Sequence, residues 1–79
     1  MGNAVIIHTQ LPPAEARALL LALREQYRAN FNQHWHADQF RLVAYALRHE
    51  TMLANVPVMA AQKRLMAALS HSLKAVKYL

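Results

Sequence analysis

Apolar side chains recur every three or four residues along most of this 79-residue chain, the spacing that places them on one face of an α-helix. The pattern predicts helices over about residues 13–31, 38–52 and 58–77. Pro13 and Pro57 lie near the starts of the first and third helices, where a residue with a fixed φ and no N–H is well tolerated. We therefore expect an all-α fold, a small three-helix bundle that forms a single domain.

Residues 1–11 follow a different pattern. Ala4–Thr9 is apolar and rich in β-branched residues, and it ends shortly before two consecutive prolines. This stretch predicts an extended N-terminal arm or a short strand. Because a lone strand is not stable without a partner, a strand here would pair with another chain or cover a groove.

The first helix is expected to bury one stripe and to expose a basic one beside it. The expected core stripe is Ala16, Leu19, Leu20, Leu23, Tyr27 and Phe31. Arg17, Arg24 and Arg28 form the neighbouring stripe. We take these three arginines as candidate partner-binding residues.

The middle helix is expected to carry two apolar faces. One face is the core stripe, which consists of Phe40, Val43, Ala44 and Leu47. The other face consists of Leu42, Tyr45, His49 and Leu53. A chain this small cannot bury both faces, so the second face indicates a dimer or another partner, unless Tyr45 and Leu53 pack on the third helix. Leu42, Tyr45 and His49 are therefore candidate partner-binding residues.

The third helix is expected to be basic and amphipathic. Residues 51–79 contain no carboxylate, and their basic side chains are Lys63, Arg64, Lys74 and Lys77. The apolar side is expected to hold Val58, Gln62, Leu65, Leu69, Leu73 and Val76. Such a helix is more often a binding element than a catalytic one. The net charge of +5 favours an anionic partner, such as an acidic protein face or nucleic acid. We expect Lys63, Arg64, Lys74 and Lys77 to face that anion.

The composition argues against an enzyme. The chain has no cysteine, which excludes disulfides and thiolate zinc sites, and its single glycine makes a phosphate-cradling loop very improbable. The four carboxylates are scattered, so no acid–base pair is indicated. His34 and His36 would need a third ligand, such as His49 or Asp38, to hold a metal, and they read more simply as turn residues around an anchoring Trp35. We expect no metal, no cofactor and no catalysis.

The longest uncharged tracts are too short for the roughly 18–20 apolar residues that span a bilayer. We therefore expect no membrane span and a cytoplasmic location.

One stretch resembles a known family. Ile6–Pro12, followed by a helix, resembles the opening of ribbon-helix-helix DNA-binding proteins, and Asp38–Arg48 is similar to the second helix of that family. Together the two stretches and the helix between them cover about half of the chain. The resemblance implies a dimer whose two strands pair antiparallel in the major groove, with Ile6, His8 and Gln10 facing the bases.

Two functions follow from these patterns. The first is a small regulatory or inhibitory protein that acts by binding another protein, as a homodimer. The alternative is a DNA-binding transcriptional regulator that uses the Ile6–Gln10 strand, with His8 and Gln10 facing the DNA.

Overall fold

The computed structural model describes residues 2–76 and confirms the all-α fold with an extended arm. Residues 2–12 form neither helix nor strand in the single chain, so the arm is extended chain there. The elements that follow are α1 (Pro13–Trp35), the short 3₁₀ helix η1 (Asp38–Phe40), α2 (Tyr45–Asn55) and α3 (Pro57–Val76). Lys77, which we expected to face an anion, lies outside the described residues.

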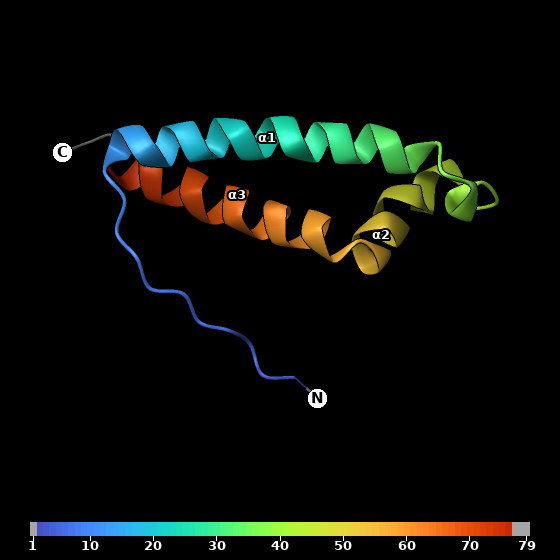
Figure 1. Ribbon diagram of the computed structural model, residues 1–79, viewed down its shortest axis with the longest axis horizontal. Helices are drawn as coiled ribbons and strands as arrows, with labels where there is room; N and C mark the ends of the chain where they lie inside the picture. Colours follow the sequence, from blue (N-terminus) through green and yellow to red (C-terminus); the bar gives the residue numbers. More distant parts are fainter. Residues whose placement is uncertain (1, 77–79) are drawn as a thin grey trace.

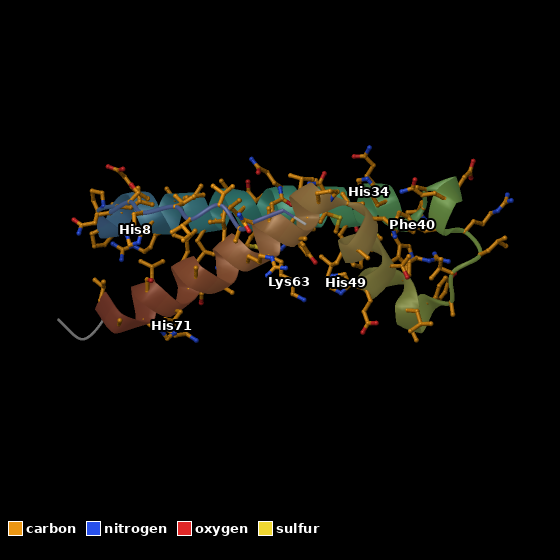
Figure 2. All side chains as sticks on the ribbon, turned by 90° about the horizontal axis from the view of Figure 1, so that it is seen from below. His8, His34, Phe40, His49, Lys63 and His71 are labelled. Carbon is orange, nitrogen blue, oxygen red and sulfur yellow. The ribbon has the colours of Figure 1, made fainter. Side chains whose placement is uncertain are left out.

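The helices form a long, thin body (Figure 1). α1 and α3 run antiparallel side by side, and α2 lies at the end where α1 finishes and α3 begins. The Cα atoms extend over 48 × 30 × 17 Å, and their radius of gyration is 15.1 Å. A compact chain of this length has a radius of gyration of about 12 Å. The axes of α1 and α3 cross at an angle, so the arm ends of the two helices lie close together in Figure 1 and apart in the view from below in Figure 2.

α1 continues four residues beyond its predicted end at residue 31. His34 donates from Nδ1 to the carbonyl oxygen of Asn30 (2.8 Å), and the ring of Trp35 stacks on Phe31 with 5.3 Å between centroids. These contacts one turn apart stabilise helical backbone across a stretch whose sequence pattern had suggested a turn. Trp35 does anchor the end of the helix, because it packs against the hydrophobic core.

The predicted middle helix over residues 38–52 is wrong in its first half. Residues 38–40 form a single 3₁₀ turn, residues 41–44 bend, and the helix begins only at Tyr45. Ala44 is extended (φ −57°, ψ 143°), which interrupts any continuous helix. The stretch that resembles the second helix of the ribbon-helix-helix family is therefore two short elements joined by a bend.

This interruption changes which side chains are buried. Ala44 and Leu47, expected in the core, are exposed, whereas Arg48 and Met52 are buried. The core of this end is formed by Phe40, Met52, Val56 and Met59. The sequence left open whether Leu53 and Tyr45 pack inside the chain or face a partner. Leu53 packs against this core, whereas Tyr45 is 73% exposed.

The α1–α3 pair follows its predicted stripes in part. Ala16, Leu20 and Leu23 are buried on α1, but Leu19 is largely exposed. On α3 the fully buried residue is Met59, and three residues of the expected stripe, Val58, Leu65 and Val76, are exposed. Gln62 is buried, and its side-chain amide joins the two helices. Its Oε1 accepts from Nδ2 of Asn30 (3.2 Å), and its Nε2 donates to Oε1 of Gln26 (3.4 Å).

Candidate partner-binding site

The bend before α2 is held by a buried arginine. Arg48 projects from the first turn of α2 and is only 7% exposed. Its guanidinium donates to three backbone carbonyl oxygens, those of Trp35 (3.2 Å), Arg41 (3.3 Å) and Val43 (2.8 Å). Charged donors strengthen such bonds, so one side chain ties the end of α1 to both sides of the bend. Its buried Nε has no hydrogen-bond partner within residues 2–76.

Two aromatic rings flank the same guanidinium. Its carbon atom lies 4.9 Å from the centroid of the Trp35 ring and 4.6 Å from that of Tyr45. The two rings lie 5.5 Å apart, tilted by 42° to each other. Cation–π attraction therefore adds to the hydrogen bonds and compensates part of the cost of burying the charge.

The result is a projection from the helices, which we call the tip and define as Leu42 and Tyr45. Leu42 lies between Arg41 and Val43, the two residues whose carbonyls Arg48 binds, and is 92% exposed. Tyr45 is exposed on one face and rests on Arg48 with the other. An aliphatic and an aromatic side chain held outside the core, on a fixed backbone, are typical of an interface anchor.

His49 does not belong to the tip, although the predicted helix placed it beside Leu42 and Tyr45. Because α2 begins late, its ring turns inward and is half-buried. It shares a hydrogen bond with the Tyr27 hydroxyl and meets Phe31 edge to face, with 5.3 Å between centroids. His49 therefore joins α1 to α2 (Figure 2).

Four of the candidate basic residues line two separate grooves. Lys63 and Arg64 line one of about 430 Å³ together with Leu53 of α2. Lys74 lines another of about 350 Å³ together with Arg17 of α1. Arg24, Arg28, His8 and Gln10 are also exposed, the first two on α1 and the other two on the arm. The basic side chains of α3 thus divide between two grooves.

The sequence analysis missed Arg48, the residue that organises the site. A usable signal was present, because Arg48, Met52, Val56 and Met59 are spaced by four, four and three residues. This spacing places the four residues on one face of a helix, where Arg48 is the only one that is not apolar. An arginine within such a series can be buried when carbonyls and aromatic rings surround it.

His34 and His36 are the histidines that the sequence analysis considered as metal ligands. Among the described residues, no three His, Cys, Asp or Glu side chains gather closely enough to hold a metal ion. Nδ1 of His34 is bonded to a backbone carbonyl, and His36 is exposed. Within residues 2–76, no helix is both long and apolar enough to cross a membrane.

Comparison of this chain with protein-family models, curated proteins and solved structures finds no match.

Proposed function

We propose that this protein is a small, non-enzymatic regulator or inhibitor that binds another protein through the tip and acts as a homodimer. The observation that carries the proposal is the exposure of Leu42 and Tyr45 on a bend that Arg48 holds in place. A rigid anchor loses little conformational entropy on binding, so more of its contact energy appears as affinity. The cysteine-free composition suits a reducing compartment, and the proposal includes a cytoplasmic location.

The chemistry of the surface indicates the character of the target. Among the described residues, exposed basic side chains outnumber the carboxylates. Lys63 and Arg64 line a groove whose other lining residues, Leu53, Ala60 and Ala67, are apolar. An acidic protein face with an apolar pocket for Leu42 and Tyr45 would complement both features.

A DNA-binding regulator is the second candidate. The two basic grooves and the exposed His8 and Gln10 favour it, because lysine and arginine can neutralise phosphates. A DNA-binding mode through a paired strand requires the arm, which is extended chain in the single molecule, to become a strand with a second copy.

The test is recovery of a target from lysate with and without nuclease, followed by affinity measurement with the purified target. If the proposal holds, binding resists nuclease, and Leu42→Ala or Tyr45→Ala weakens it by about 30-fold or more, equivalent to about 2 kcal/mol. Leu21→Ala is the matched control, because Leu21 is an exposed leucine on α1 away from the tip.

The alternative makes the opposite set of predictions. Binding to DNA is sensitive to nuclease and falls steeply with salt, and changing Lys63, Arg64, Lys74 and Lys77 together to Ala flattens that dependence. His8→Ala and Gln10→Ala then relax sequence preference. The protein-binding proposal would be refuted by sequence-specific binding to DNA whose affinity falls steeply with salt and is unchanged by Leu42→Ala and Tyr45→Ala.

A further inference from the structure

The single chain exposes more surface than a protein of its size normally does. Its accessible surface is 6648 Å² for a mass of 9.0 kDa. A compact monomer of that mass exposes roughly 4,850 Å², so the excess is roughly 1,800 Å². Stable homodimers commonly remove roughly 1,000 Å² or more from each subunit, so the excess is large enough for such an interface.

Part of this surface is an uncharged groove between α1 and α3, next to the arm. It encloses about 240 Å³ and is lined by Leu11, Ala16, Leu19, Leu65, Leu69 and Ser72, among others. None of its lining residues carries a charge. The two grooves described above contain Arg17 with Lys74 and Lys63 with Arg64. Two copies of a chain with a net charge of +5 meet with least repulsion at the uncharged groove.

The arm has the complementary chemistry. Val5, Ile6 and Ile7 are 87%, 82% and 75% exposed, and residues 2–12 contain no Asp, Glu, Lys or Arg. Three consecutive branched apolar side chains in water favour burial in an apolar groove. Six extended residues, 4–9, span about 20 Å, which is more than half of the length of α1.

The arm does not fill the groove of its own chain. Thr9 and Leu11 line the groove, but the side chains of Val5–Ile7 remain exposed to water. No glycine lies within residues 8–12, and Pro12, at φ −54° and ψ 147°, keeps the chain extended where it enters α1. Figure 1 shows the arm leaving the start of α1 and running clear of both helices.

We propose that the groove between α1 and α3 receives the Val5–Ile7 segment of a second copy of this chain, and that two copies exchange their arms reciprocally. A reciprocal exchange closes a two-fold dimer and uses the same contact twice. It leaves the tip and both basic grooves available to a target. The inference supplies the contact for the dimer in the proposed function and is independent of what the tip binds.

The test measures the mass of the full chain by sedimentation equilibrium at micromolar concentration. The wild type should have the mass of two chains. Val5→Asp/Ile7→Asp should yield single chains, because two carboxylates would enter an apolar groove. Leu65→Lys should do the same by placing a charge in the groove, and since Leu65 is 45% exposed, the fold should tolerate the change. Leu19→Lys, on the opposite wall, serves as a second groove variant, and circular dichroism checks helix content throughout.

A mixture of variants tests the pairing directly. A Val5→Asp/Ile7→Asp chain mixed with a Leu65→Lys chain should regain the mass of two chains. In that heterodimer the acidic arm meets the lysine, and the unchanged arm meets the unchanged groove. Leu21→Asp/Leu42→Asp is the matched control, because it adds the same charge at two exposed leucines outside the groove, and it should remain a dimer.

Several results would overturn the inference. A wild-type chain that sediments as a monomer excludes a dimer with exchanged arms. Oligomers whose size keeps growing with concentration also exclude it, because a reciprocal exchange stops at two chains. A Val5→Asp/Ile7→Asp chain that remains dimeric excludes the arm. If the groove variants stay dimeric and the arm variant becomes monomeric, the two arms pair with each other and not with the grooves. Loss of the dimer in the control would assign the contact to the surface around Leu21 or Leu42, and a mixture that stays monomeric would refute the pairing of arm with groove.

Discussion

The two ends of this molecule are built from the same kinds of residue but differ in how completely they are packed. At the α2 end, η1, α2 and the adjoining ends of α1 and α3 surround Met52 and Met59, both of which are 0% exposed. At the arm end, no third helix of the described residues 2–76 joins α1 and α3 (Figure 1), and Leu19 and Leu65 are 40% and 45% exposed. A pair of helices has two open faces, and a third element is needed to enclose a side chain completely.

This difference assigns separate roles to the two ends. At the enclosed end, hydrogen bonds from Arg48 hold the bend that presents Leu42 and Tyr45. The open end has an apolar groove that remains to be covered, and the arm begins beside it. The experiments below test this contrast by damaging one end at a time, in order of decreasing expected effect.

The largest effect is expected from emptying the enclosed core. Met52→Ala should lower the free energy of unfolding by about 3–4 kcal/mol, because it leaves a cavity that the surrounding helices fill only in part. Leu65→Ala at the open end should cost less than about 1 kcal/mol in a monomeric background such as Val5→Asp/Ile7→Asp. Urea denaturation at one chain concentration measures both. Met52→Leu is the volume-conserving control, and equal losses at the two ends would contradict the contrast.

Arg48→Ala should have the next largest effect. It removes three hydrogen bonds to backbone carbonyls and two cation–π contacts, which together indicate a loss of about 2–3 kcal/mol. Trp35 is the only tryptophan, so a red shift of its emission should report the same change locally.

Arg48→Lys is the informative companion variant. It keeps the charge but lacks the planar fork that reaches three carbonyls, so an intermediate loss is expected. If Arg48→Ala left both stability and Trp35 emission unchanged, the bend would not depend on the guanidinium.

Much of this fold was predictable because helical periodicity is a local property. The three helices and the extended arm were expected from spacing and prolines, and α1 and α3 begin within a residue of their predicted starts. The middle helix failed because no glycine or proline marks residues 41–44. The bend that interrupts it is held by the side chain of Arg48, which donates a hydrogen bond to the carbonyl oxygen of Arg41, seven residues earlier. The helix propensities of residues 41–44 give no sign of that contact.

The candidate site shows the same division. Leu42 and Tyr45 were recognised as apolar residues outside the core stripe, and the structure places both on the surface. His49 was misplaced, because the side it faces depends on where the helix begins. Burial of Arg48 depends on carbonyls and rings brought together from α1, the bend and α2, which only the folded chain assembles.

A smaller effect is expected at the polar contact between the two ends. Gln62→Ala should lower stability by about 1 kcal/mol, because Asn30 and Gln26 lose their partner on α3. Gln62→Leu should cost less, since leucine fills the space and the partners on α1 can turn toward water. Urea denaturation distinguishes them. A greater loss from Leu than from Ala would indicate that the amide contact, and not the filled volume, holds α1 and α3 in register.

The smallest effect is expected above pH 10, at the contact between α1 and α2. Burial raises the pKa of the Tyr27 hydroxyl above its ordinary value of 10.0, and the hydroxyl shares a hydrogen bond with His49. The unfolded chain therefore loses this proton at lower pH than the folded chain does. The resulting contribution to stability is fully present below pH 10 and is lost as pH rises through the folded pKa.

Relative to wild type, Tyr27→Phe should lower stability by a constant amount below pH 10 and then show a shallower alkaline decline. Tyr45→Phe, at an exposed ring, is the control and should keep the wild-type slope. Parallel declines for wild type and Tyr27→Phe would mean that Tyr27 ionises equally readily in the folded and unfolded chains, and that the enclosed end admits water as freely as the open one.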